Sequence, residues 1–121
     1  MTRIALVLLT GIVAATLAGC GSAGPAVPAT AQAAPEAAVT VQTFQFQPGD
    51  LAVRAGTRVT WTNQDDIGHT VTSGTPENRD RRFDSPLNSK GAKFSHTFTQ
   101  PGTYTYFCDR HQSMRGQIRV N

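Results

Sequence analysis

This chain has few cysteines, little net charge and no helical patterning. Cys20 and Cys108 are its two cysteines among 121 residues, so at most one disulfide is possible. Eleven basic residues against eight acidic ones give a net charge of +3, an excess that does not indicate binding of nucleic acid. No stretch places apolar residues at helical spacing, and no segment is repeated. Helical and repeat architectures are therefore not expected.

The first residues have the order of a secretory signal peptide. Arg3 supplies a positive start, residues 4–17 are almost wholly apolar, and small residues follow. The apolar run is too short for a membrane span. It ends in Leu17-Ala18-Gly19-Cys20, which resembles a bacterial lipobox, in which the cysteine becomes the lipidated N-terminus.

We therefore expect residues 1–19 to be a lipoprotein signal peptide. Lipidation of Cys20 would then anchor the exported protein to a bacterial membrane, in the periplasm or at the cell surface. The alternative is an ordinary cleavage site with an incidental cysteine.

Residues 20–38 have the composition of a flexible tether. Alanine and proline dominate this segment, and it has no apolar period. From Val39 the pattern changes to short alternating stretches of β-branched and aromatic residues, separated by Gly and Pro turns. These stretches predict strands at residues 39–46, 51–54, 57–63, 69–72, 93–99, 103–108 and 117–120. We therefore expect residues 39–121 to form one all-β domain, a sandwich or a barrel.

Residues 73–92 are the one long polar connection, with a short strand or turn expected near Phe83. A domain of this size buries a modest fraction of its surface, so it is marginally stable unless something else holds it together. A metal ion that binds the folded state and not the unfolded state would supply that stabilisation.

The segment from Cys108 to Met114 carries the strongest chemical signal. Cys108, His111 and Met114 are spaced as C-x₂-H-x₂-M between two predicted strands, and His69 lies upstream after a turn-prone segment. If Cys20 is lipidated, Cys108 is a lone thiol in an oxidising compartment, which calls for an explanation. Two imidazoles, a thiolate and a weak axial thioether are the ligands of a blue-copper electron-transfer site. We therefore predict one type 1 copper ion, bound by these four residues.

The same region resembles the cupredoxin family of blue copper proteins. The resemblance is plastocyanin/azurin-like, and the spacing of the metal loop is most similar to that of amicyanins. It covers residues 39–121 and rests on segments 59–63, 68–71, 94–98, 101–108 and 111–120. It implies an antiparallel Greek-key β-sandwich with copper at one end. It also implies that His69 binds copper from within and that His111 lies near the surface, where the electron enters and leaves.

Two positions depart from the pattern of the family. Its members often carry Asn after the first ligand histidine, whereas this chain has Thr70, whose hydroxyl we expect to substitute near the thiolate. The surface around the exposed histidine is often apolar, whereas Arg110 and Gln112 flank His111 here. These neighbours argue against the usual hydrophobic docking face.

Two further residues of the predicted strands need a separate interpretation. His96 alternates in phase with Phe94 and Phe98, so we expect a half-buried strand residue and not a metal ligand. Phe107 alternates with Cys108, which points at the metal, so we expect Phe107 to face outward.

An electron shuttle between a donor and an acceptor protein accounts best for the four ligands, and we expect it to act as a monomer. A protein of copper storage, delivery or sensing is the alternative, but such proteins often expose several Met or His ligands, and this chain has two methionines. A copper enzyme would need a second copper site built from further histidines. A structural zinc site is a weaker alternative, because methionine is a poor zinc ligand. We therefore expect no enzymatic activity.

Overall fold

The computed structural model describes Gly21, Gly24 and residues 32–121. The predicted signal peptide and Cys20 lie outside the described residues. The described part forms strands and no helix, and none of its segments is a helix able to cross a membrane. The strands are β1 (Glu36–Gln42), β2 (Gln45–Gln47), β3 (Asp50–Val53), β4 (Thr57–Asn63), β5 (His69–Gly74), β6 (Arg79–Leu87), β7 (Lys93–Phe98), β8 (Gly102–Phe107) and β9 (Arg115–Val120).

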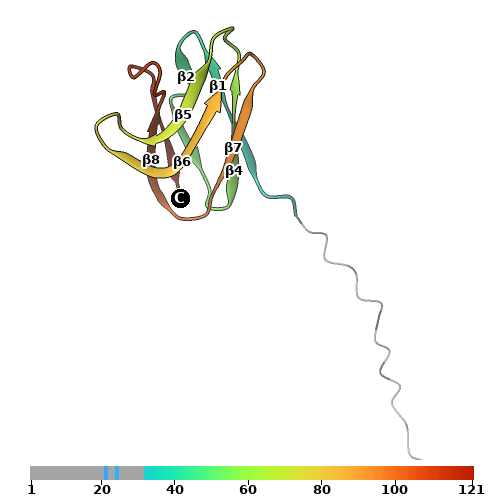
Figure 1. The fold of residues 1–121 in the computed structure, drawn as a ribbon. Coiled ribbons are helices and arrows are strands. Elements are labelled where there is room, and N and C mark those ends of the chain that lie inside the picture. The colour runs from blue at the N-terminus through green and yellow to red at the C-terminus, as the bar shows by residue number, and fades with distance from the viewer. Residues whose placement is uncertain (1–20, 22–23, 25–31) are drawn as a thin grey trace, which may run out of the picture. The chain divides into compact units, whose positions relative to one another are not determined.

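The strands form two sheets that pack as a sandwich (Figure 1). The first sheet has the order β2-β1-β4-β7, and the second has the order β3-β9-β8-β5-β6. The expected cupredoxin-like β-sandwich is confirmed. Its sheets are mixed, because β1 runs parallel to β4 and β3 runs parallel to β9, while the other pairs are antiparallel. Parallel partners need a long connection, and both pairs join strands that are separated by other strands in the sequence.

Aromatic side chains from both sheets fill the space between them. Trp61 of β4 is fully buried, stacks on Phe94 at 5.5 Å between ring centroids, and meets Tyr106 of β8 edge-on at 5.4 Å. Phe46 packs edge-on against Tyr106 at 4.7 Å. Such pairs contribute about 0.5–1.5 kcal/mol each beyond the burial of their area. Burial also raises the pKa of Tyr106 to about 12, so this phenol stays neutral. The core thereby holds the strands that carry the functional site.

The first strand begins before the expected start of the domain. Glu36 and Ala37 pair with Arg58 and Val59 of β4, so β1 extends upstream of Val39. Alanine and glutamate have low strand propensity, so pairing with an existing strand, and not local sequence, makes this segment extended.

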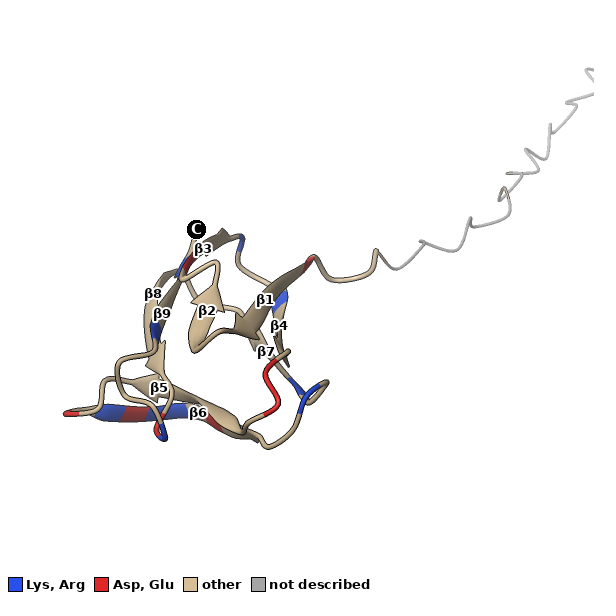
Figure 2. Cartoon of the chain, turned by 90° about the horizontal axis from the view of Figure 1, so that it is seen from above, with Lys and Arg blue, Asp and Glu red and all other residues tan. Residues whose placement is uncertain are grey.

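The β6 strand, at the edge of the second sheet, is longer than the short strand expected near Phe83. A β-bulge interrupts its pairing with β5, and Arg81 has a φ of 58°. The Ser73 hydroxyl accepts the N–H groups of Arg82 at 2.9 Å and Phe83 at 3.0 Å. A bulge of this kind breaks the alternation that identifies a strand in a sequence. Figure 2 shows the basic and acidic residues that follow one another along β6.

We expect Phe107 to face outward, but this outward position is covered and not open to solvent. Phe107 is fully buried, although strand alternation places it on the face opposite Tyr106. The guanidinium of Arg79 lies over its ring, 5.8 Å from the centroid, and forms an ion pair with Asp109. The start of β6 therefore covers a residue that alternation alone assigns to solvent.

Candidate metal centre

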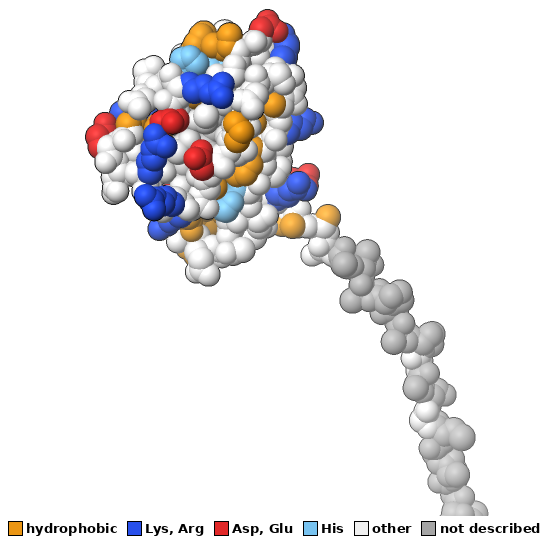
Figure 3. Space-filling view, viewed as in Figure 1, with side chains coloured by type: hydrophobic (Ala, Val, Ile, Leu, Met, Phe, Trp, Pro, Cys, Tyr) orange, Lys and Arg blue, Asp and Glu red, His pale blue; other side chains and the backbone are white. Residues whose placement is uncertain are grey.

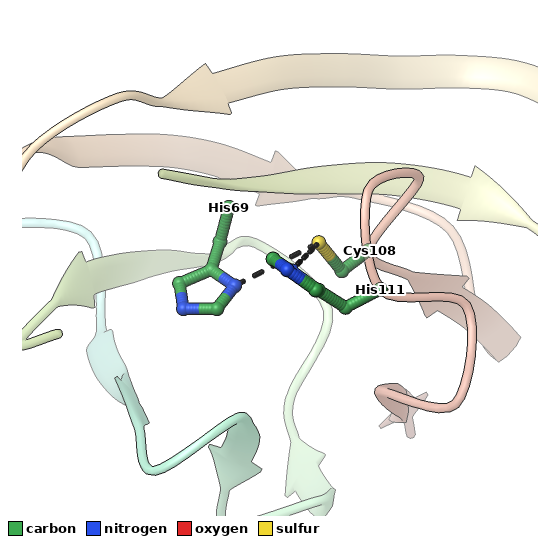
Figure 4. A group of neighbouring side chains, drawn as sticks. All are labelled: His69, Cys108 and His111. Atoms are coloured by element: carbon green, nitrogen blue, oxygen red, sulfur yellow. Dashed lines mark hydrogen bonds between the residues drawn. The ribbon is translucent and has the colours of Figure 1, made fainter. Parts of the chain in front are cut away.

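One sulfur and two imidazole nitrogens meet at the end of the sandwich where β5 begins and β8 ends (Figure 4). The Cys108 Sγ atom lies 3.8 Å from His69 Nδ1 and 3.7 Å from His111 Nδ1. The three potential ligand atoms lie within 4.8 Å of one another. Metal–ligand bonds of about 2.0–2.3 Å at an angle of about 120° place two ligand atoms about 3.7 Å apart. The spacing therefore fits a single metal ion between the three side chains.

Tight turns in the β8–β9 connection gather the residues of the C-x₂-H-x₂-M motif. The His111 N–H donates to the Cys108 carbonyl at 3.3 Å, and the Met114 N–H donates to the His111 carbonyl at 2.8 Å. The Cys108 N–H donates back to the Met114 carbonyl at 3.1 Å and closes the loop. Met114 is buried in the same apolar cluster as Cys108. The motif therefore folds locally, with its three side chains at one end of the core.

Asn63, at the end of β4, organises the loop that leads to His69. It is fully buried, and its Nδ2 group donates to the carbonyls of Ile67 at 2.8 Å and Leu87 at 3.1 Å. Its Oδ1 atom accepts the N–H of Asp65 at 2.9 Å. One amide side chain thus ties the β4–β5 loop to the end of β6 and fixes the point where β5 begins.

Asp65 orients His69, and the sequence did not identify it. Its Oδ2 atom accepts a hydrogen bond from His69 Nε2 at 2.9 Å, which leaves Nδ1 free to face Cys108. A carboxylate on the second nitrogen of a histidine ligand fixes its tautomer and raises its basicity. Burial acts to raise the pKa of Asp65, but the N–H groups of Thr43 and Phe44 and the His69 ring hold it below its usual value. In the sequence this aspartate looks like any other residue of a polar turn.

Phe44 rests against both imidazoles and was also missed. Its ring lies edge-on to His69 at 5.6 Å and to His111 at 5.0 Å between centroids. Thr43 and Phe44 form the tight turn between β1 and β2 with φ values of 51° and 57°, a region that non-glycine residues rarely adopt. Asp65 accepts both of their N–H groups and so stabilises the turn. The signal in the sequence is a shift in the alternation of apolar residues at this turn.

The Cys108 sulfur accepts a hydrogen bond from the N–H of Thr70 at 3.3 Å. The Thr70 hydroxyl has another role, because it accepts the N–H of Asp109 at 2.7 Å and bonds to the Thr72 hydroxyl at 3.0 Å. Thr72 in turn donates to Asp84 at 2.9 Å. The threonine therefore does act near the thiolate, but its amide contacts the sulfur while its hydroxyl holds the metal loop to β5.

Comparison with known proteins agrees with this geometry. Residues 33–121 match the family described as copper binding proteins, plastocyanin/azurin family. This chain is a cupredoxin. The predicted family membership is confirmed, and the cofactor that the family and the ligand atoms indicate is one copper ion.

Individual relatives and solved structures support the same assignment of this cupredoxin. Amicyanin-alpha from Methylorubrum extorquens is 30% identical over 82 residues, which cover 68% of this chain and 69% of the relative. Amicyanin from Paracoccus denitrificans is 32% identical over 82 residues, which cover 68% of this chain and 63% of the relative. A purple cupredoxin from Nitrosopumilus maritimus matches with a TM-score of 0.65 and 30% identity, over 70% of this chain and 99% of that structure.

The two histidines of the centre differ in exposure. His69 is fully buried, whereas His111 is half-buried at the surface of this cupredoxin. The polar neighbours of His111 in the sequence are exposed, as expected. Apolar surface is nevertheless present, because Phe44 is 51% and Ile67 is 41% exposed. Residues from the β1–β2 and β4–β5 connections, and not from the metal loop, supply it.

His96 lies apart from the centre, in β7. Its ring packs against Phe83 at 4.9 Å and Phe98 at 4.8 Å between centroids, as a half-buried strand residue. Burial lowers its pKa. Within the described part of the chain, His69, Cys108 and His111 form the one cluster of metal-binding side chains.

Proposed function

We propose that this cupredoxin is a one-electron carrier whose copper ion is bound by His69, Cys108, His111 and Met114. The observation that supports it most directly is the convergence of the Cys108 sulfur with two imidazole Nδ1 atoms at 3.7 and 3.8 Å. Copper with these ligands cycles between Cu(II) and Cu(I), since imidazoles suit the first state and the two sulfurs suit the second.

The surrounding residues would keep the ligands in place while the charge changes. Asp65 holds the His69 ring, and the hydrogen bond from the Cys108 N–H to the Met114 carbonyl closes the metal loop. The N–H of Thr70 stabilises negative charge on the sulfur and so tunes the reduction potential. A site that moves little on reduction exchanges its electron with little reorganisation.

His111 is the ligand through which the electron would enter and leave. It is half-buried, whereas His69 is fully buried behind Asp65 and Phe44. A partner protein can therefore approach His111 more closely than the other imidazole. The proposed partners are one electron donor and one electron acceptor, each bound transiently by a monomeric carrier.

The alternative function is copper storage, delivery or sensing. Such proteins keep an open site, whereas here Cys108 is fully buried and Met114 is 2% exposed. A copper enzyme such as an oxidase would need a second copper site built from further histidines, whereas the four proposed ligands suffice for a carrier. We therefore propose that the protein is not an enzyme.

The residues that precede β1 are proposed to deliver and tether the domain. Residues 1–19 would act as a lipoprotein signal peptide, Cys20 would be lipidated, and the segment between Cys20 and the start of β1 at Glu36 would hold the domain outside the cytoplasm. Mass spectrometry of the protein purified from bacterial membranes should find lipid on Cys20. A mature N-terminus downstream of Cys20 would rule the anchor out.

The copper site can be tested by adding one equivalent of Cu(II) to the metal-free protein and recording visible absorption and electron paramagnetic resonance. An intense thiolate-to-copper band with narrow hyperfine splitting, reversibly bleached by a mild reductant, is expected. Cys108→Ala should abolish the band, Met114→Gln should keep copper at a shifted potential, and His96→Gln should change neither. A weak band typical of tetragonal copper would instead favour copper handling.

A further inference from the structure

Arg110 is held in a fixed position at the copper end of the molecule. It lies in the metal loop, and its guanidinium lies against Gly68, so closely that a β-carbon at Gly68 would collide with it. From another side, Arg110 Nη2 donates to Asn88 Oδ1 at 2.9 Å. An exposed arginine is thus held by two segments other than its own, which reduces the entropy that it loses on binding a ligand.

The charge of Arg110 is not neutralised within the described part of the chain, where it forms no ion pair. Other basic side chains of the domain do have acidic partners. Lys90 pairs with Asp66 at 3.5 Å, and Arg115 pairs with Glu77 at 3.7 Å. Arg110 therefore presents unpaired N–H donors and a full positive charge close to the exposed metal ligand.

Apolar surface adjoins this arginine. Ile67 directly precedes the glycine on which the guanidinium lies, and it is 41% exposed. Phe44 is 51% exposed and contacts the ring of His111, the residue that follows Arg110 in the sequence. Figure 3 shows histidine, basic and hydrophobic side chains next to one another at the upper end of the molecule. Arginine and aromatic residues are the side chains enriched in protein interfaces.

We propose that Phe44, Ile67, Arg110 and His111 form a docking surface for a partner protein, and that Arg110 binds a carboxylate of that partner. The partner would present an acidic side chain beside a small apolar patch. This inference rests on the proposed electron-carrier function and names a property of its partners. A planar guanidinium binds a carboxylate with two parallel hydrogen bonds, which fixes orientation as well as distance. The apolar contacts would then bring the partner's redox centre close to His111.

Two small redox reagents can test the surface in the copper-loaded protein. Ferrocenium carboxylate has an apolar body and a carboxylate, and hydroxymethylferrocenium lacks the carboxylate. Each takes one electron from the reduced protein, which yields the Cu(II) form together with ferrocenecarboxylate or neutral hydroxymethylferrocene. The quantity to measure is the oxidation rate with ferrocenium carboxylate divided by the rate with hydroxymethylferrocenium, at low ionic strength. It should fall about two- to fivefold in Arg110→Gln, the range expected for one surface ion pair.

Arg81→Gln is the matched control, because it removes the same charge from an exposed arginine of β6. The ratio in this variant should equal that of the unchanged protein. Asn88→Ala keeps the charge of Arg110 but removes the hydrogen bond at 2.9 Å. Its ratio should therefore lie between those of the unchanged protein and Arg110→Gln. An equal fall in Arg81→Gln would show a general charge effect and overturn the proposal, as would no fall in Arg110→Gln.

Binding without electron transfer gives an independent measurement. Ferrocenecarboxylate added to the reduced protein should shift the amide resonances of Gly68 and Arg110 in a heteronuclear spectrum. Equal shifts with inorganic phosphate would mean that any anion suffices, which would overturn the carboxylate-and-apolar partner. If the reduced protein reacted with neither ferrocenium reagent, the electron-carrier function itself would fail. Reaction with both at a ratio unaffected by Arg110 would reject the docking surface alone.

Discussion

Asp65 Oδ2 lies 2.9 Å from His69 Nε2, so one carboxylate decides which nitrogen of this histidine faces the Cys108 sulfur. The same carboxylate accepts the N–H groups of Thr43 and Phe44, at 2.8 and 3.1 Å. Asp65 thereby couples the orientation of a buried ligand to the strained turn that places Phe44 against both imidazoles. A single residue outside the ligand set supports two parts of the site.

Replacement of Asp65 by Asn should weaken both parts. The amide group cannot accept all three hydrogen bonds, so the free energy of unfolding should fall by about 1–2 kcal/mol. A less basic His69 and the loss of a negative charge should disfavour Cu(II), so the reduction potential should rise. Chemical denaturation and a redox titration of the copper-loaded protein measure the two effects.

Asp66→Asn is the control for this experiment, because that carboxylate is 87% exposed and, among the residues that the structure describes, pairs only with Lys90. It should leave the stability nearly unchanged and raise the potential less than Asp65→Asn does. Equal shifts in the two variants would mean that charge, and not the bond to His69, controls the potential.

Asn63→Ala should be among the most destabilising single changes in the domain. The buried amide of Asn63 serves the carbonyls of Ile67 and Leu87 and the N–H of Asp65, and alanine would leave these groups without that partner. We expect a loss of about 2–3 kcal/mol in the free energy of unfolding and faster release of copper to a chelator. Asn78→Ala, at an exposed position, should change neither quantity. Unchanged copper release in Asn63→Ala would separate this loop from the metal site.

Thr70→Val tests the attachment of the metal loop to β5. Valine keeps the shape and the N–H that contacts the Cys108 sulfur, but it leaves the N–H of Asp109 without its acceptor. The free energy of unfolding should fall by about 1–2 kcal/mol, and hydrogen exchange at Asp109 should become faster. Thr70→Ser restores the hydroxyl and should restore slow exchange. Exchange that stays slow in the valine variant would show that other contacts hold the loop.

The parts of the site that could be predicted are those encoded close together. Cys108, His111 and Met114 lie within one short loop, and tight turns bring them to one side whatever the rest of the fold does. Strands β1 and β4 bury alternate residues, so their pattern is visible in the sequence. Local patterns therefore sufficed for the motif and for much of the sandwich.

The remaining parts depend on contacts between distant segments. Asp65 meets Thr43 and Phe44 only because the β1–β2 turn and the β4–β5 loop lie at the same end of the sandwich. The burial of Phe107 also depends on a distant segment, because Arg79 at the start of β6 covers its ring. A sequence pattern records which face a side chain occupies, but it does not record what later covers that face.

His96 provides a test of how stability depends on pH. Burial against Phe83 and Phe98 lowers its pKa below the usual 6.5, so the unfolded chain takes up a proton before the folded one does. Stability should therefore be highest above pH 6.5 and should decline as the pH falls from 6.5 through the lower pKa of the folded state. Below that pKa both states carry the proton, and this contribution stops changing.

His96→Phe keeps an aromatic ring against the same neighbours and removes the titration. Denaturation midpoints of the copper-loaded proteins should be measured between about pH 5 and pH 8, where an unperturbed histidine changes its charge. The difference in stability between His96→Phe and the unchanged protein should grow as the pH falls. Because His96 lies outside the metal cluster, the visible band of the variant should not change. A constant difference across this range would mean that the pH dependence arises elsewhere, and that β7 tolerates a charged histidine without loss of stability.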